Sequence, residues 1–118
     1  MLPRASRLTQ AADFRRTIRA GHKARTSTVL VHGLLQPGSA APRAGVTVNK
    51  AVGGSVTRHY VARVIRHALV DALSQAPEGS MWVVRALPAA GERASGHQVA
   101  HDVQRGFAEI LESARSGR

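Results

Sequence analysis

The 118-residue chain has no cysteine and only four aromatic residues, two Phe, one Tyr and one Trp. The lack of cysteine excludes a disulfide framework, a thiol nucleophile and a zinc–cysteine site, and it suits a reducing compartment. Nowhere do about 18 apolar residues follow one another. The N-terminal stretch MLPRASRL also has no apolar run that could serve as a signal sequence. We therefore expect a cytoplasmic protein with no membrane association.

Acidic residues are also scarce, and their distribution is uneven. The chain has 17 Lys and Arg against 7 Asp and Glu, a formal net charge of +10. Residues 1–70 carry 12 of the basic residues and a single acid, Asp13, whereas residues 71–118 carry 5 basic and 6 acidic residues. Such asymmetry favours a polyanionic partner held against one surface. Nucleic acid is the favoured partner, with an anionic membrane surface or a basic disordered arm as alternatives.

The length suits one domain over residues 1–118, with flexible ends at about 1–6 and 114–118. Periodicity and turn residues predict, in order, a helix over 9–20, a strand or bent pair of short strands over 24–36, a hairpin tip over 36–43, a strand over 44–50, a helix from about 55 that ends before 77, a strand over 81–87 and a helix beginning near 99. The apolar run over 81–87 predicts a central strand, with Trp82 in the core. The fold class is α+β, a single-domain α-β sandwich in which helices pack on a small mixed sheet.

Particular residues are expected to shape the ends of these elements. Thr9 is the expected N-cap of the first helix, and Gly21 is expected to end it in a left-handed conformation. Gly33 is a candidate bulge. Ser55 or Thr57 is expected to cap the central helix.

The central stretch, NKAVGGSVTRHYVARVIRHAL over residues 49–69, is the most informative part of the sequence. At about 100° per residue one helical face is apolar. It comprises Val61, Val64, Ile65, Ala68, Leu69, Ala72 and Leu73, and the neighbouring face carries His59, Arg63, Arg66 and His67. No acid lies between Asp13 and Asp71 to neutralise this second face. The pattern favours phosphate binding over a merely solvated face.

The loop before this helix is a candidate phosphate cradle. Arg58 lies in the first helical turn and can reach back to the loop, where free amides also favour an anion. The cradle would consist of Asn49, Lys50, Gly53, Gly54, Ser55 and Arg58. The glycine spacing matches neither a Walker loop nor a dinucleotide fingerprint, so nucleotide binding is disfavoured.

Catalytic and metal-binding patterns are weak. His97 and His101 stand at i, i+4 with Asp102 beside them, but no third ligand converges, so a solvated helix face is favoured. The acids Asp13, Asp71, Glu78 and Asp102 are placed in terminal or connecting positions of different elements. There is also no GxSxG elbow. The polypeptide alone is not expected to be a catalyst or to hold a metal ion.

For two aromatic residues the sequence leaves open whether the side chain packs in the core or stacks on nucleic-acid bases. Phe14 stands one turn from Ile18, a spacing typical of core residues, but an aromatic side chain can equally stack on bases of a single strand. Tyr60 lies at the edge of the basic sector and could do the same.

The central stretch resembles the signature of the bacterial ribonuclease P protein component. In that signature a strand ends in a Ser/Lys pair, a Gly-Asn turn follows, and an Arg-Asn-Arg helix presents basic residues. RLTQAADFRRTIRAG resembles the family's opening helix, RAGVTVNK its alternating strand, and MWVVRALPAA its strand that is followed by a proline, so the resemblance covers roughly residues 7–111. Arg58, Arg63 and Arg66 match basic positions, whereas His59 and Tyr60 stand where the family has Asn and its second Arg.

The resemblance implies an α-β sandwich with a left-handed βαβ crossover. It also implies the role of accessory subunit in an endoribonuclease: the protein binds the catalytic RNA and the single-stranded 5′ leader of precursor tRNA. The hydrolysis that releases mature 5′ ends would be performed by Mg²⁺ held mainly by the RNA. This chain would then contain no catalytic residue, and it would need no obligate protein partner.

The residues matched to these roles form two sets. The expected RNA-binding set is Lys50, Gly53, Ser55, Arg58, His59, Arg63 and Arg66. The expected leader cleft is Phe14, Arg15, Arg16, Val48 and Tyr60. A ribosomal or other structural RNA-binding protein of similar fold is the main alternative function. A DNA-binding regulator that uses the central helix in a major groove is a further alternative, disfavoured because no second helix precedes Ser55 closely.

Overall fold

The structure, a computed structural model, describes residues 2–92 and 95–116. Its elements are a 3-10 turn (Arg4–Ser6), α1 (Ala11–Ala20), β1 (His22–Arg25), β2 (Val29–Leu34), β3 (Arg43–Thr47), α2 (Ser55–Leu73), β4 (Met81–Ala86), α3 (Ala89–Glu92) and α4 (Gly96–Arg115). The four strands form one sheet in the order β1-β2-β4-β3. Pairing is antiparallel except between β3 and β4, which are parallel. The mixed sheet and the α+β class are thus confirmed. Among the helices described, none is long and apolar enough to cross a membrane.

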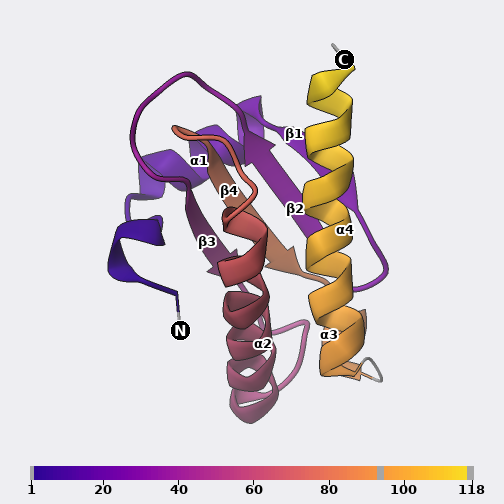
Figure 1. Cartoon of the computed structure of the whole chain (residues 1–118). Coiled ribbons are helices and arrows are strands. Elements are labelled where there is room, and N and C mark those ends of the chain that lie inside the picture. Colours follow the sequence, from indigo (N-terminus) through magenta and orange to yellow (C-terminus); the bar gives the residue numbers. More distant parts are fainter. Residues whose placement is uncertain (1, 93–94, 117–118) are drawn as a thin grey trace.

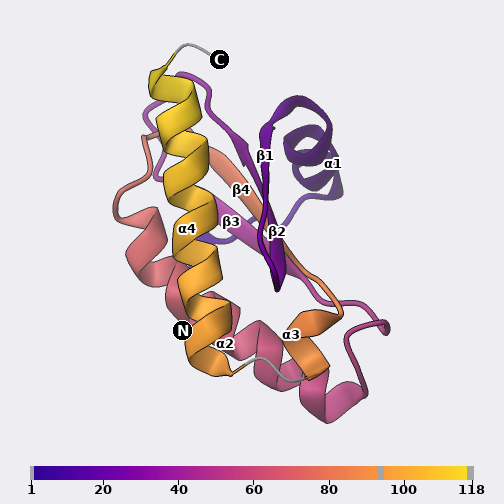
Figure 2. The same cartoon turned by 90° about the vertical axis from the view of Figure 1, so that its right-hand side faces the viewer.

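The sheet is covered unequally on its two faces. α2 and α4 pack side by side on one face, and α1 lies on the other (Figures 1 and 2). Alternation along β4 sends Trp82 and Val84 into the main core with α2 and α4, and it sends Met81 and Val83 into a smaller cluster under α1. Because β4 is central and covered on both faces, its sequence is a continuous apolar run, as predicted.

Trp82 is the largest fully buried side chain. Its ring stacks on Phe107 of α4, with ring centroids 3.9 Å apart and an interplanar angle of 14°. Its indole Nε1 donates to Ser80 Oγ at 2.9 Å. Gly33 is paired regularly with Trp82 and is not a bulge. A side chain there would overlap the indole ring, so the glycine serves to leave space for the ring.

The parallel pair β3 and β4 is joined through α2 in the left-handed sense. In Figure 1 both strand arrows point downward, α2 lies in front of the sheet, and β4 lies to the right of β3. Parallel strands joined by one helix are almost always connected in the right-handed sense. The resemblance implied this feature, which periodicity alone could not have indicated.

The ends of the helices differ from the sequence-based expectations. α1 has Gln10 at its N-cap, without a side-chain cap, so the prediction for Thr9 was wrong. Gly21 ends α1 with φ −80° and ψ 168°, which is extended and not left-handed. A Cβ on Gly21 would lie 2.5 Å from the carbonyl oxygen of Thr17, so close approach explains the glycine.

The start of α2 was also misjudged. Its N-cap is Gly54, and no side chain caps it. Ser55 is the first helical residue and Thr57 the third, so neither is the cap. Gly53, with φ +154°, has a backbone conformation that other residues rarely adopt, which allows the chain to turn into the helix.

Two connecting segments also depart from expectation. The loop over 36–43 is not a hairpin tip, because β4 lies between β2 and β3. The segment after β4 contains the short helix α3, while residues 93–94 lie outside the described part. Near the N-terminus, Leu2 is 3% exposed and packs in the core. At the other end α4 continues to Arg115, and residues 117–118 are outside the described residues.

Asp102 was expected in a terminal or connecting position, and this prediction was wrong. It lies within α4 and is fully buried. Its Oδ2 accepts from the backbone N of Thr28 at 3.2 Å and from Thr28 Oγ1 at 2.7 Å, and its Oδ1 accepts from Gln98 Nε2 at 3.0 Å. The carboxylate therefore ties α4 to the residue just before β2.

We expect Asp102→Ala to lower the free energy of unfolding by roughly 1 to 3 kcal/mol, because it leaves both donors of Thr28 buried without an acceptor. Urea unfolding followed by Trp82 fluorescence would measure the change. His101→Ala is the matched control: its side chain is 66% exposed and its Nδ1 is 4.0 Å from the same carboxylate. Equal stabilities for the two variants would contradict the assigned role of Asp102.

Candidate nucleic-acid interface

α2 separates apolar and basic side chains as its periodicity predicts. Ile65 and Leu69 are fully buried against the sheet and α4. His59, Arg63, Arg66 and His67 are all exposed. No described acidic residue lies on this helix before Asp71. The helix thus presents a continuous basic stripe, defined here as these four residues.

One hollow lies between the stripe and β3, with a volume of about 330 Å³. It is lined by Val46, Val48, Ser55, Arg58, His59, Ala62 and Arg66, of which Ser55, Arg58, His59 and Arg66 belong to the predicted RNA-binding set. Arg58 is half-buried, and its Nε is buried without a hydrogen-bond partner among the described residues. A buried donor without an acceptor is costly, so an incoming oxygen atom would be stabilised there. We call this lining the β3-side hollow.

The predicted phosphate cradle is only partly present. Three amides of the loop are already engaged in turns: Ala51 N donates to Asn49 Oδ1 at 3.0 Å, Val52 N to Asn49 O at 3.1 Å, and Gly53 N to Lys50 O at 3.2 Å. These three amides are therefore not free to donate to an anion. Lys50 is exposed and does not line the β3-side hollow. What is left for an anion is the first turn of α2 with Ser55 and Arg58.

A second groove lies on the opposite face of the sheet, where α1 leaves part of it uncovered. Its volume is about 540 Å³, and it is lined by Ile18, Arg25, Leu30, Thr47, Asn49, Ala51, Arg85, Ala86, Leu87 and Pro88. Four of these residues form one row across all four strands, because Arg25 pairs with Leu30, Leu30 with Arg85, and Arg85 with Thr47. Paired residues project to the same face, so two arginines flank an apolar floor. We call it the α1-side groove.

Sequence reasoning missed most of this groove. Arg85 is the only exposed residue of β4 and the only charged one in that apolar strand, which was a usable signal. Arg25 gave a weaker signal, since alternation with buried Ala24 places it on the opposite face. Neither signal shows that the two arginines flank Leu30, because that depends on the strand order.

The five residues predicted for a leader cleft do not lie together. Phe14 is half-buried on the α1 side, where it packs on Leu8, Met81 and Val83. Arg15 is exposed on α1, and Arg16 Nη2 donates to Gln36 Oε1 at 2.5 Å. The other two residues are on the opposite face: Val48 lines the β3-side hollow, and Tyr60 lines a hollow between α2 and α4. None of the five lines the α1-side groove.

His32 is an unusual buried group on the α1 side of the sheet. It is 3% exposed, and neither ring nitrogen has a hydrogen-bond partner among the described residues. Burial lowers the pKa of His32 from its ordinary value of 6.5, and the positive charges of Arg85 and Lys23 lower the pKa further. His32 is therefore neutral in the folded protein near pH 7.

Metal ligands do not converge in the described part of the chain. No group of three or more His, Asp or Glu residues there is arranged so that it could hold a metal ion. In particular, Asp102 is engaged with Thr28 and Gln98, and His101 is its exposed neighbour.

Comparison with known proteins gives consistent matches. The family model described as Ribonuclease P matches residues 2–111. The ribonuclease P protein component of Streptomyces bikiniensis is 43% identical over 119 residues, which cover 94% of this chain and 96% of the relative. That of Corynebacterium diphtheriae is 44% identical over 110 residues, covering 88% and 92%.

Solved structures show the same fold. A mutant RNase P protein of Staphylococcus aureus superposes with a TM-score of 0.72 at 24% identity, covering 94% of this chain and 89% of that chain. The RNase P protein of Thermotoga maritima gives a TM-score of 0.72 at 20% identity, covering 84% and 94%.

We expect His32 to make the protein less stable as the pH falls below about 6.5. The unfolded chain then binds a proton that the folded chain resists, so folding is disfavoured progressively down to the lowered pKa of the folded state. His32→Leu should flatten the dependence of the urea midpoint on pH between 7 and 5. His101→Leu, at an exposed position, is the control and should leave the slope as in the wild type. An unchanged slope in His32→Leu would show that His32 does not titrate in this way.

Proposed function

The chain belongs to the family of ribonuclease P protein components, subunits of an endoribonuclease that processes tRNA, and we propose that it binds the catalytic RNA with α2 and the 5′ leader of precursor tRNA with the α1-side groove. In this role it assists Mg²⁺-dependent removal of the leader, and it acts in the cytoplasm.

The observation that carries this proposal is the presence of two cationic hollows on opposite faces of one sheet. The β3-side hollow contains Arg58 and Arg66, and the α1-side groove contains Arg25 and Arg85. The sheet, buried between the helix layers, separates them (Figure 2). A protein that must hold two RNA segments at once needs two such surfaces, whereas binding of one folded RNA needs only one.

The RNA-facing side fits phosphate chemistry. The exposed Arg63 and Arg66 neutralise phosphates and release counterions, which favours binding without reading sequence. Arg58 adds a donor, Nε, that has no acceptor within the described part of the protein. His59 and Ser55 line the same hollow and supply further hydrogen-bonding groups.

The α1-side groove fits an unpaired strand. Ile18, 36% exposed, and Leu30 form apolar surface on which bases can lie, and Arg25 and Arg85 flank it for the backbone. Phe14 does not line the groove, and it is held in the small cluster under α1. The leader-binding residues we propose are therefore Ile18, Leu30, Arg25 and Arg85, in place of Val48 and Tyr60.

The chemistry of hydrolysis belongs to the partner in this proposal. The Mg²⁺ ions are held mainly by the catalytic RNA and supply the activated water and charge stabilisation. The protein's own groups bind and position two polyanions whose mutual repulsion would otherwise keep them apart.

We expect Arg58→Ala with Arg63→Ala to weaken binding of the catalytic RNA and to reduce the slope of log K against log salt by about 1.4 to 1.8, since each phosphate contact contributes about 0.7 to 0.9. Filter binding across a salt series measures both quantities. Arg105→Ala with Arg115→Ala removes the same charge from exposed positions of α4 and serves as the control. If both pairs reduced the slope equally, the stripe would be an ordinary solvated surface.

We expect the wild-type chain to stimulate cleavage of precursor tRNA by its cognate catalytic RNA at low magnesium.

The variant Arg25→Ala with Arg85→Ala should lose affinity for precursor tRNA with a leader, while affinity for mature tRNA and for the catalytic RNA is retained. Single-turnover cleavage and binding titrations of the reconstituted complex measure these effects. No stimulation by the wild type would overturn the processing function and favour a structural RNA-binding protein. An equal loss for mature tRNA would overturn the role of the groove.

A further inference from the structure

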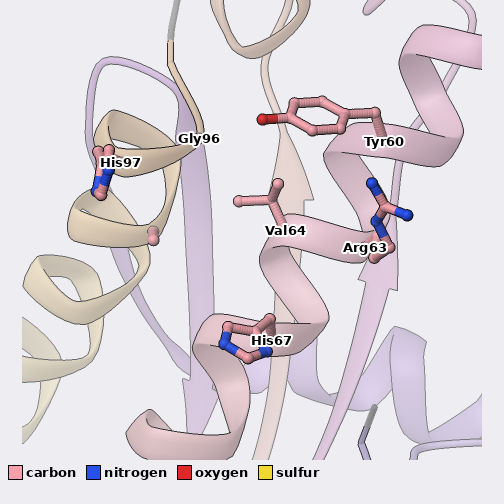
Figure 3. A pocket seen from close by; sticks show the side chains of 7 residues that line it. Tyr60, Arg63, Val64, His67, Gly96 and His97 are labelled. Carbon is pink, nitrogen blue, oxygen red and sulfur yellow. The ribbon is translucent and has the colours of Figure 1, made fainter.

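A hollow between α2 and α4 is distinct from both the β3-side hollow and the α1-side groove. Its volume is about 470 Å³, and it is lined by Tyr60, Arg63, Val64, His67, Gly96, His97 and Ala100. In Figure 3 the ring of Tyr60 lies at one end, His67 lies at the other, and Val64 lies between them, with Gly96 and His97 on α4. We call it the α2–α4 hollow.

Tyr60 is exposed in a way that packing does not explain. Its side chain is 48% exposed, although it is one of only four aromatic residues. Its hydroxyl reaches across to the first turn of α4, where a Cβ on Gly96 would be only 2.8 Å away. The Arg63 guanidinium lies 5.8 Å from the ring centroid, within range of a cation–π contact. The ring is thus held in place between two helices and still accessible.

The chemistry of the lining selects for a flat aromatic group that carries negative charge. Val64, Gly96 and Ala100 provide a shallow apolar floor, and the Tyr60 ring provides a stacking surface. Arg63, His67 and His97 are the polar members of the lining, and no acidic residue is among the described ones. A nucleobase with its attached phosphate has both of these properties.

The position of the hollow indicates which nucleic acid it meets. Arg63 and His67 also line the adjoining hollow with His59 and Arg66, so the α2–α4 hollow is continuous with the basic stripe. The α1-side groove lies on the other face of the sheet. Resting on the function proposed above, we propose that the α2–α4 hollow binds an unpaired base of the catalytic RNA, which stacks on Tyr60 while Arg63 contacts its phosphate.

Stacking on Tyr60 contributes to the affinity for RNA but not to its salt dependence, so binding measured across a salt series distinguishes stacking from charge. Tyr60→Leu should weaken binding of the catalytic RNA about 10-fold, within the roughly 5- to 150-fold range of base–aromatic stacking, while leaving the salt slope unchanged. Tyr60→Phe keeps the ring and should bind as the wild type does. Val70→Ala, at another exposed apolar position of α2, is the control. Unchanged affinity of Tyr60→Leu would overturn the proposal, as would a loss that Tyr60→Phe shares.

Photocrosslinking identifies the partner directly. A benzophenone side chain in place of Tyr60 should crosslink to one or two nucleotides of the catalytic RNA in the complete complex with precursor tRNA, and the same group in place of Val70 should not. Crosslinks to the leader or to tRNA would overturn the assignment to the catalytic RNA. Crosslinks spread over many nucleotides would show an exposed ring without a binding site.

The outcomes also distinguish this inference from the function on which it rests. If the wild type fails to bind the catalytic RNA at all, the proposed function is wrong and the inference with it. If the wild type binds and stimulates cleavage but Tyr60→Leu behaves identically, only the stacking site is wrong. Thermal unfolding of each variant would confirm that the exposed substitutions leave the fold intact.

Discussion

The stack of Trp82 on Phe107 is the contact on which the arrangement of the layers depends. Trp82 lies in the central strand, and Gly33 leaves the space that its ring occupies over β2. Phe107 brings α4 onto that ring, and α2 packs beside α4 on the same face. The aromatic pair thus holds α4 over the central strand, and α2, which carries the basic stripe, packs beside α4 and on β3 and β4.

α2 has to satisfy two demands at once. Its apolar face is buried between the sheet and α4, and its basic stripe has to remain in solvent. A hollow flanks the stripe on each side, one toward β3 and one toward α4. On the other face of the sheet the short helix α1 packs mainly on β2 and β4 and reaches β3 through Phe14 beside Gly45, while the row from Arg25 to Thr47 lines an open groove. Incomplete coverage of the sheet thus creates the α1-side groove, the second of the two proposed binding surfaces.

Sequence patterns were most accurate where a property belongs to a single element. Alternation and helical periodicity correctly placed Trp82 in the core and the basic stripe in solvent. They were least accurate at the ends of elements, because Gln10 and Gly54 stand at N-caps where stronger capping residues lie nearby. Asp102 was also misplaced, since nothing local reveals that Thr28, 74 residues away, provides its donors.

By itself the sequence determined the α+β class, the order of the elements, the basic face of the central helix and the family to which the chain belongs. Only the tertiary structure decided that Val48 and Tyr60 lie on the opposite side of the sheet from α1, and that Arg25 and Arg85 flank Leu30. The physical reason is that periodicity assigns a side chain to one face of its own element. Which element then covers that face depends on strand order and on the sense of the crossover through α2, and both are set by packing between residues distant in the chain.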